Sequence, residues 1–493
     1  MTRYLFTYIA ALAFVAGFCG CGGSEAVPTA SAPRIFPDYD GVTVPVNIAP
    51  PNFRIEGYDG RARATLEVAS QSVTVTTRDG AFRLPRRAWR RLCEAAAASG
   101  EAIAVTVETR GKDGAWVRYA PFAIYVSGDE IDPYMVYRLI EPGYETWGEM
   151  GIYQRCLENY GEDAIIENSS AGYGCVNCHT FCGQDPDMML FHMRQSLPGT
   201  MLLRDDRIER LNTVTDGTIS STVYPSWHPG GRYIAFSVNA TKLITLPDES
   251  NRVEVFDSAS DVVVYDTGRH ELFTVPELSR GDRFETFPAF SAAGDRLYFC
   301  VADSVEMPRR YKDARYSLCS VSFDAASGRL GTQVDTLYNA RTSGRSVSFP
   351  RVSPDGAFML YALSDYGNFS IWHRDADLRM VDLRSGREVE TAVVNSPEAE
   401  SYHSWSSNSR WILFNSRRVD GLYTHVYMAH VAADGTLSKP FLLPQRDPDF
   451  YRTFMKSYNI PEFVRGRVTV PERRIVSEAR ESEPAKVTFR MQQ

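Results

Sequence analysis

The segment Cys175-Val176-Asn177-Cys178-His179 carries the residue types and the spacing best suited to chemistry. Two thiols at this spacing can form thioethers to both vinyl groups of one haem, and the adjacent histidine can then bind the iron. Random placement of 9 Cys and 8 His in 493 residues gives on the order of 0.003 such motifs. The motif therefore predicts one covalent haem c, held by Cys175, Cys178 and His179.

Two other kinds of site would use the same residues. Cys182 follows closely, so that Cys175, Cys178, His179 and Cys182 also form a possible ligand set for zinc or for an iron–sulfur cluster. A disulfide between two of these cysteines would suit an oxidising compartment. These alternatives stay open beside haem.

The N-terminal residues predict where the chain resides. Arg3 precedes an apolar run from Tyr4 to Phe18, which is too short for a membrane-spanning helix and is typical of a signal peptide. Gly20-Cys21 then resembles a bacterial lipoprotein signal, in which a small residue precedes the lipidated cysteine. We expect residues 1–20 to be a signal peptide and Cys21 to carry the lipid that anchors the chain in the bacterial cell envelope, periplasmic or outer-membrane. An ordinary signal peptide with incidental cysteines is the alternative.

Two parts of the chain lie between this signal and the motif. Residues 21–33, rich in Gly, Ser, Ala and Pro, predict a flexible linker. Residues 34–130 contain one predicted helix, with Pro85 near its start and Gly100 past its end. The remaining apolar runs predict short strands at Val42–Val44, Ala64–Val68, Val73–Thr77, Ile103–Glu108 and Phe122–Val126. We expect a small β-sandwich of immunoglobulin-like character here.

The composition is that of a globular, β-rich chain. Hydrophobic residues make up 44% of it, and its 26 Tyr and 26 Phe favour strands over helices. The net charge is −8 and no strongly basic block is present, so nucleic acid is excluded as a partner. The fold class we predict is all-β.

A repeat organises the second half of the chain. Four segments align without a gap, each with an aromatic residue first, a bulky apolar residue three positions later and another aromatic residue twelve positions later. They begin at Tyr224, Phe287, Phe349 and Tyr402, and one shared turn position holds Gly231, Gly294, Gly356 or Ser409. Each segment predicts a hairpin within a small sheet. Such sheets bury their faces when they stack radially.

The repeat resembles that of TolB-type β-propellers, whose usual form is P-x-W-S-P-D-G followed by an apolar strand. Ser353-Pro354-Asp355-Gly356 matches this form, whereas His228–Gly231 and Ser406–Ser409 match it in part. The resemblance covers residues 170 to 445 and implies a propeller fold, but it indicates almost nothing about activity, because propellers host many functions.

Flanking segments are expected to complete the ring. We predict a TolB-like propeller of about six blades, with five or seven as alternatives, over residues 131–470. Strands at Val136–Ile140, Ala164–Glu167 and Val468–Val470 are expected to join both chain ends in one blade. Residues 471–493 predict a charged, loosely held C-terminal tail.

The motif itself fits the repeat. With Phe181 in the position of Trp227, His179 takes the position held by Pro225 and by His403 in other segments. We therefore predict His403 as the second axial ligand of the iron, with His192 as the alternative. Met188 or Met189 would instead raise the redox potential.

Together these features predict an envelope lipoprotein whose propeller carries one covalent haem c. It would transfer single electrons or sense redox state with an envelope protein as partner, and with the membrane reached through the lipid. One alternative is a non-catalytic binding or scaffold lipoprotein in which C-x-x-C-H is structural. Another is a redox enzyme with an open iron site. The sequence has no nucleophile elbow, zinc-binding helix or phosphate loop, so we expect no hydrolase.

Overall fold

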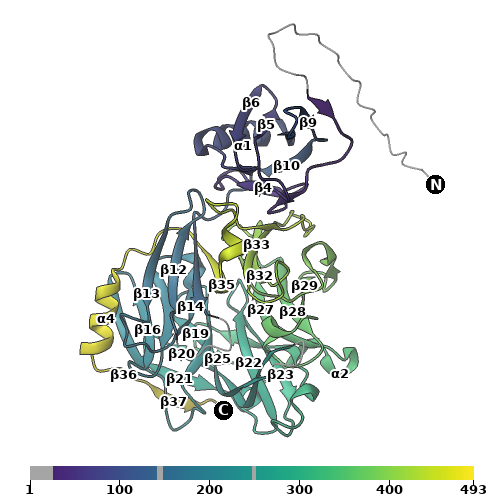
Figure 1. Cartoon of the computed structure of the whole chain (residues 1–493). Helices are drawn as coiled ribbons and strands as arrows, with labels where there is room; N and C mark the ends of the chain where they lie inside the picture. The colour runs from purple at the N-terminus through teal and green to yellow at the C-terminus, as the bar shows by residue number, and fades with distance from the viewer. Residues whose placement is uncertain (1–25, 142–147, 247–250) are drawn as a thin grey trace, which may run out of the picture.

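The computed structural model describes residues 26–141, 148–246 and 251–493, which form a small N-terminal domain and a larger ring of sheets (Figure 1). The predicted signal peptide and Cys21 lie outside the described residues. No helix of the described part is long and apolar enough to span a membrane. The all-β prediction is confirmed for both units.

The N-terminal domain encloses its core between a seven-stranded sheet, a three-stranded sheet and helix α1 (Arg86–Ser99). The larger sheet contains β1 (Val27–Pro28), β3 (Thr43–Pro45), β5 (Ala62–Val68), β6 (Gln71–Thr77), β8 (Ile103–Arg110), β9 (Trp116–Arg118) and β10 (Phe122–Ser127). The smaller one contains β2 (Ile35–Phe36), β4 (Phe53–Ile55) and β7 (Ala81–Phe82). The predicted strands are therefore present, but the layer that faces the larger sheet includes a helix.

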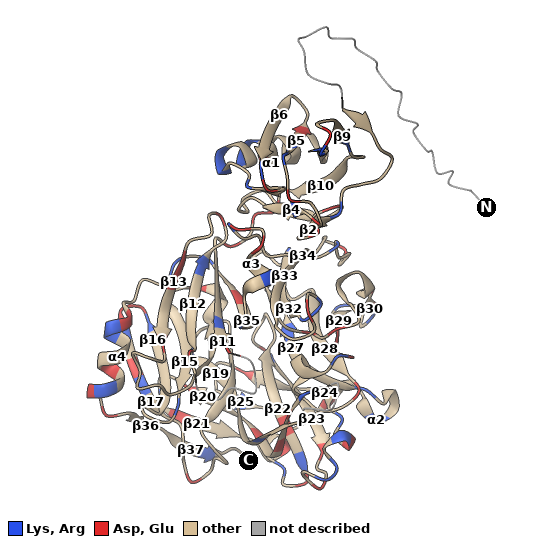
Figure 2. Cartoon of the chain, in the orientation of Figure 1, with Lys and Arg blue, Asp and Glu red and all other residues tan. Residues whose placement is uncertain are grey.

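Helix α1 has the predicted ends. Pro85 precedes it in an extended conformation, and Gly100 ends it with φ 73°, a left-handed conformation that glycine adopts without a steric penalty. Trp89, Leu92 and Cys93 are buried on its inner face, and its arginines are exposed to solvent (Figure 2). The spacing of apolar residues explains this orientation.

The ring consists of six blades, in agreement with the prediction of about six. The first blade contains β35 (Ser457–Val464), β11 (Tyr134–Ile140), β12 (Gly151–Cys156) and β13 (Glu162–Glu167), from the inside outward. The second contains β14 (Val176–Phe181), β15 (Met188–Met193), β16 (Gly199–Arg204) and β17 (Arg207–Asn212). The third contains β18 (Thr222–Trp227), β19 (Tyr233–Thr245), β20 (Val253–Asp266) and β21 (Glu271–Thr274).

The other three blades follow the same order. The fourth contains β22 (Arg283–Phe290), β23 (Arg296–Asp303), β24 (Ser317–Asp324), β25 (Arg329–Leu330) and β26 (Asp335–Tyr338), and α2 (Ala340–Ser343) follows it. The fifth contains β27 (Ser346–Val352), β28 (Phe358–Ser364), β29 (Asp377–Asp382) and β30 (Glu388–Val389). The sixth contains β31 (Glu400–Trp405), β32 (Trp411–Ser416), β33 (His425–His430) and β34 (Phe441–Leu442), and α3 (Phe450–Thr453) precedes β35. Each inner strand contacts the next around a closed circle.

The first blade joins the two ends of the propeller, as predicted, but through a different strand. The closing strand is β35, which pairs antiparallel with β11, and not the segment Val468–Val470. Ile460-Pro461-Glu462-Phe463 repeats the pattern of the other inner strands with an aliphatic residue in first place. Our alignment required an aromatic residue there, so the sequence prediction missed this strand.

The C-terminal segment is also held more firmly than predicted. Helix α4 (Glu472–Glu481) buries Ile475 and Ala479 against the first two blades, and most of its other residues carry charge of either sign (Figure 2). Strand β36 (Ala485–Lys486) then pairs with β17, and β37 (Thr488–Met491) pairs with β21. The prediction of a loosely held tail is wrong, because buried apolar residues and strand pairing fix residues that composition alone assigned to solvent.

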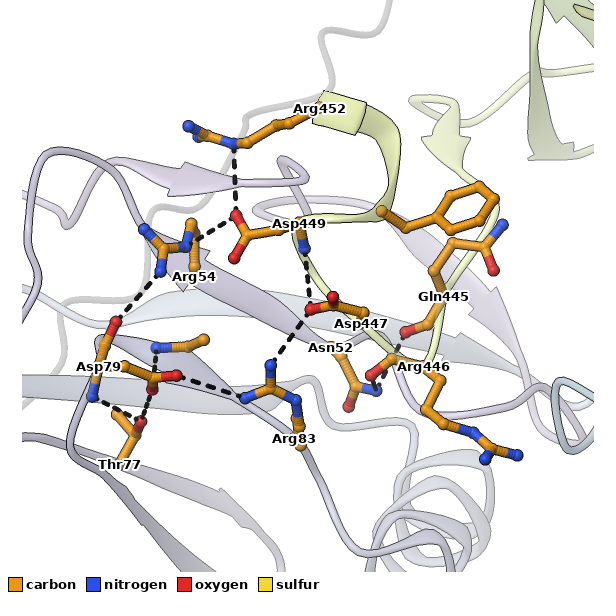
Figure 3. A network of polar contacts seen from close by, with 12 residues as sticks. Asn52, Arg54, Thr77, Asp79, Arg83, Gln445, Arg446, Asp447, Asp449 and Arg452 are labelled. Carbon is orange, nitrogen blue, oxygen red and sulfur yellow. Dashed lines mark hydrogen bonds and ion pairs between the residues drawn. The ribbon is translucent and has the colours of Figure 1, made fainter. Parts of the chain in front are cut away.

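Polar contacts join the N-terminal domain to the sixth blade and to the segment after it, and Figure 3 shows those made with the segment. The buried Asn52 side chain donates hydrogen bonds to the carbonyl oxygens of Gln445 and Arg446, each at 3.0 Å. Arg54 forms an ion pair with Asp449 at 2.9 Å. The Trp411 indole also donates to the carbonyl oxygen of Asp129 in the connection between the two units. This contact orients the domain on the ring.

Candidate functional site

The C-x-x-C-H motif lies on the innermost strand of the second blade. Strand β14 is interrupted by a β-bulge at Cys178, whose φ of 53° is in the left-handed region. The other five inner strands have a left-handed residue at the same position: Tyr224, Phe287, Phe349, Tyr402 and Ile460. The predicted alignment of the motif with the repeat is therefore confirmed, and Cys178 takes the place of an aromatic residue.

These bulges turn their side chains toward the axis of the ring. The rings of Phe287 and Phe349 lie 4.1 Å apart, Tyr224 lies 4.4 Å from Phe287, and Tyr402 lies 4.9 Å from Phe349. This aromatic cluster fills most of the axis. Cys178 is near enough to Tyr224 and Tyr402 to affect the pKa of both phenols, so its side chain faces the same axis.

His179 faces a different environment. Its ring is buried beside the backbone of Val136 and Ile460, in the gap between the first and second blades. Neither ring nitrogen makes a hydrogen bond of good geometry with the described residues. Burial lowers the pKa of His179 to about 3, so the imidazole is neutral. A neutral imidazole with unpartnered nitrogens could bind a metal, but as folded it does not point toward the axis that Cys178 faces.

The predicted second ligands lie elsewhere. His403 is buried in the gap between the fifth and sixth blades, where its Nε2 hydrogen-bonds the carbonyl oxygen of Leu360 at 3.0 Å. His192 faces the third blade, with Nδ1 2.8 Å from the Thr200 hydroxyl and its ring 6.0 Å from that of Phe236. The structure thus brings neither His403 nor His192 together with His179. His403 holds the equivalent position on another blade and faces a different gap, and His192, on the neighbouring strand of the same blade, faces the third blade instead.

Cys175 directly precedes the inner strand β14 and lies beside basic residues. Its sulfur lies 3.9 Å from Nη1 of Arg138. Burial raises the pKa of the Cys175 thiol, and the charges of Arg138 and Arg194 oppose that effect. The thiol therefore stays protonated near neutral pH.

The remaining sulfur residues do not complete a metal site. The Cys182 sulfur lies 3.7 Å from the carbonyl oxygen of His228 on the third blade, and Met188 packs beside Gly231 of the same hairpin turn. Across residues 26–141, 148–246 and 251–493, no three His, Cys, Asp or Glu residues form a group that could hold a metal ion, and all seven cysteines there are free thiols. Haem attachment, which needs a porphyrin and an assembly pathway, stays a prediction.

A funnel opens at the opposite end of the same axis. Its cavity has a volume of about 400 Å³, and all six blades contribute to its wall. The wall includes Phe181, Trp227, Phe290, Trp405, Arg351 and Glu462. Every one of these residues lies on an inner strand within three positions of its bulge, so the repeat itself builds the funnel.

Two charged groups stand at the base of this funnel. Burial raises the pKa of Glu462 to about 7, although the nearby charge of Arg351 lowers it. Burial likewise lowers the pKa of the Arg351 guanidinium, and Glu462 opposes this. The two side chains affect each other without forming an ion pair within 4.0 Å. Glu462 also interacts with the Thr180 hydroxyl and the Phe181 backbone. A carboxylate accepts about four hydrogen bonds and a guanidinium donates five, so both groups keep capacity for another molecule.

Sequence reasoning missed these two residues. Arg351 and Glu462 each follow the proline after a bulge, at a position that holds a serine in Tyr224-Pro225-Ser226 and in Tyr402-His403-Ser404. The other repeats hold a small residue at this position, so a charged residue there is a signal of a functional group. For Glu462 this signal becomes visible only when the closing strand is recognised as a repeat.

The fold and the axial site define a six-bladed β-propeller with an N-terminal β-rich domain. Neither the protein-family models nor the curated proteins contain a match to the chain. Among solved structures, the periplasmic gluconolactonase PpgL of Pseudomonas aeruginosa is 15% identical with a TM-score of 0.34, covering 66% of this chain and 99% of that one. Porphyromonas gingivalis dipeptidyl peptidase 4 is 14% identical with a TM-score of 0.32, covering 68% of this chain and 51% of the peptidase.

A puromycin-hydrolyzing peptidase of Mycobacterium tuberculosis is 11% identical with a TM-score of 0.32, over 86% of this chain and 57% of that chain. This chain thus spans little more than half the length of either peptidase. Likenesses of this degree carry no argument about activity.

Proposed function

We propose that this chain is an envelope-tethered binding protein whose propeller holds a small ligand, or the end of a partner's chain, in the axial funnel. The observation that supports it is the funnel of about 400 Å³ to which every blade contributes, with Arg351 and Glu462 at its base. Sites for small molecules commonly combine an apolar lining with a few polar groups that fix orientation.

The chemistry of the funnel indicates a class of ligand. The Arg351 guanidinium suits a carboxylate, and Glu462 suits an amine. Trp227, Phe290 and Trp405 supply aromatic surface around these charges. A ligand that carries both a carboxylate and an amine, such as a free amino acid or short peptide, would satisfy both groups.

Intrinsic fluorescence can test this proposal, because Trp227 and Trp405 line the funnel. Titration of the purified chain with unblocked trialanine should change the emission and saturate. The same peptide with an acetylated amine and an amidated carboxyl should bind at least about tenfold more weakly, since it loses both charge-assisted contacts. Arg351→Gln and Glu462→Gln should each weaken the unblocked peptide. Equal responses to both peptides, or no response to either, would contradict the proposal.

A second candidate is the haem-linked function, an electron carrier or redox sensor. One observation favours it: neither buried ring nitrogen of His179 makes a hydrogen bond of good geometry with the described residues, and His179 directly follows two thiols at the spacing used for haem attachment. Haem would supply one-electron chemistry to this strand. Because Cys178 and His179 face different environments, attachment of one porphyrin to both requires β14 to leave the conformation described here.

A pyridine haemochrome assay separates the two candidates. The chain would be produced in a periplasm that contains cytochrome c assembly machinery, with Cys175→Ala and Cys178→Ala as controls. A haemochrome spectrum and a matching mass increase that both variants lose would support the haem-linked function. A colourless chain of unmodified mass, from cells in which a known cytochrome c is matured, would remove it and leave the binding function.

A further inference from the structure

A cavity opens between the second and third blades, on the face of the ring opposite the funnel. Its volume is about 440 Å³. The end of β15, the start of β16, the end of β17 and the start of β18 meet around it, and Pro484 of the C-terminal segment completes the wall. Because β14 and β18 reach the funnel with Phe181 and Trp227, the cavity at the other end of these blades lies about the length of a strand away from it.

A row of hydroxyl groups lies along one side of this cavity. The hydroxyls of Thr200 and Thr222 lie 3.4 Å apart, and those of Thr213 and Thr222 lie 3.0 Å apart. His192, which pairs with Thr200 in the sheet, extends the row, with its Nδ1 2.8 Å from the Thr200 hydroxyl. All four side chains are buried, and all four residues line the cavity. The polar row therefore crosses the boundary between the two blades.

This row holds one more hydrogen than the contacts between its members can use. Burial lowers the pKa of His192, so its ring is neutral and carries a single N–H. Three hydroxyls and this N–H supply four hydrogens, whereas three contacts join the members of the row. The Nε2 of His192 makes no hydrogen bond of good geometry with the described residues, and the Thr213 hydroxyl already accepts from the Thr222 backbone N–H. The row thus has a donor to spare and needs an acceptor from another molecule.

The charge of the cavity also favours an acceptor. Its wall includes two arginines and, among the described residues, no Asp or Glu. Arg194 is half-buried and donates to the Ser221 hydroxyl at 3.1 Å, and no described carboxylate forms an ion pair with it within 4.0 Å. Arg210 donates to the carbonyl oxygens of Pro198 and Ala479, so it contributes charge rather than free donors. The cavity therefore combines positive charge and a spare donor with no negative group.

The rest of the wall is apolar and consists of Met193, Pro198, Leu211, Val214 and Pro484. Met193 and Leu211 are buried, whereas Val214 is 56% exposed. Val214 therefore lies where the cavity meets solvent. Sites for small molecules commonly have such a lining, with a few polar groups that fix the orientation of the ligand.

We propose that this cavity binds a short aliphatic carboxylate, with the Arg194 guanidinium and the threonine hydroxyls on its carboxylate and the apolar wall along its chain. Arginine suits this group because its fork of donors matches two oxygens at once. Hydroxyls rotate and a neutral imidazole has two tautomers, so the row can present its spare hydrogen to the ligand. The proposal does not depend on the ligand of the funnel, because no residue lines both cavities.

Calorimetric titration of the full chain with hexanoate near neutral pH, and with hexanamide as the uncharged analogue, tests this proposal. Hexanoate should bind, and hexanamide should bind at least about tenfold more weakly, because it lacks the charge that Arg194 recognises. Arg194→Gln should weaken hexanoate binding by about 10- to 100-fold, the loss expected for a hydrogen bond to a charged group. Arg207→Gln is the matched control, because Arg207 is an exposed residue of the same blade outside the cavity wall, and it should bind hexanoate normally.

Hydrogen exchange of the unaltered chain keeps the proposal testable if Arg194→Gln fails to fold. Hexanoate should slow backbone exchange in residues 193–200 and 212–222, and it should leave the funnel turn at residues 353–357 unchanged. Equal binding of the two ligands, unchanged binding by Arg194→Gln, protection only at the funnel, or no binding of hexanoate would each overturn the proposal. Failure of trialanine to bind while hexanoate binds would count against the function proposed for the funnel alone.

Discussion

Replacing Glu285 with glutamine should stabilise the protein increasingly as the pH rises. Glu285, on β22, is 0% exposed, and neither of its carboxylate oxygens makes a hydrogen bond of good geometry with the described residues. Burial, and then the charge of Asp261, raise the pKa of Glu285 to about 8; the Arg280 backbone and the charges of Arg283 and Arg280 oppose this. The folded state therefore retains a proton that the unfolded chain releases above its ordinary pKa of 4.5.

The sign and size of the effect follow from proton linkage. Below pH 4.5 both states are protonated and Glu285 costs nothing through titration. Between pH 4.5 and about 8 the unfolded chain binds fewer protons than the folded one, so stability falls by about 1.4 kcal/mol per pH unit. The loss reaches about 5 kcal/mol at pH 8, and glutamine, which has no charge to bury, avoids it.

Urea unfolding of both proteins from pH 5 to pH 8.5 measures this difference. Other titrating groups are common to the two proteins and cancel. Glu306→Gln serves as the control for the same substitution at an exposed site, because that side chain is 61% exposed. Infrared spectra should also show a protonated carboxylic acid at pH 6.5 that Glu285→Gln lacks. A stability difference that does not change with pH would refute the assignment.

Three further predictions concern packing and contacts. Ile475→Ala should destabilise the ring by about 2–5 kcal/mol in thermal and urea unfolding, because Ile475 is completely buried, whereas Ile219→Ala, at a side chain 41% exposed, should change little. Asn52→Ala should cost about 1–3 kcal/mol by leaving the carbonyl oxygens of Gln445 and Arg446 unpaired, and hydrogen exchange should rise at the domain contact; unchanged exchange would contradict its role. His403→Ala should leave the spectrum of any haem-loaded chain unaltered while it lowers the melting temperature, and a changed spectrum would restore His403 as a ligand.

The blades could be predicted because two positions of each repeat, the bulge and the following turn, accept only certain residue types. The residue at each bulge points to the axis and the next turn needs a left-handed residue, so aromatic residues and Gly231, Gly294 or Gly356 recur at fixed spacing. The closing strand escaped prediction because Ile460 meets the same backbone requirement without an aromatic ring. Charge composition misled the prediction for residues 471–493, since the few apolar residues of α4 decide its placement.

The site was harder to predict than the fold. Cys178 and His179 are adjacent in the sequence, but neighbouring side chains of a strand point to opposite sides, and the bulge at Cys178 adds to this difference. Cys178 therefore faces the axis, and His179 faces the first blade. Arg138, Arg194 and Arg417 lie far apart in the sequence and reach one face of the ring only because second strands of different blades end there. Such convergence depends on ring closure, which no local pattern expresses.

The two short C-terminal strands have a consequence for contacts between molecules. The outermost strand of a blade normally exposes unpaired backbone groups that a strand of another chain could extend. Parallel pairing of β36 with β17 and of β37 with β21 covers that row on two neighbouring blades. Self-association by strand addition is therefore blocked along this part of the rim. Removal of β36 and β37 would expose the unpaired edge strands of two neighbouring blades at once.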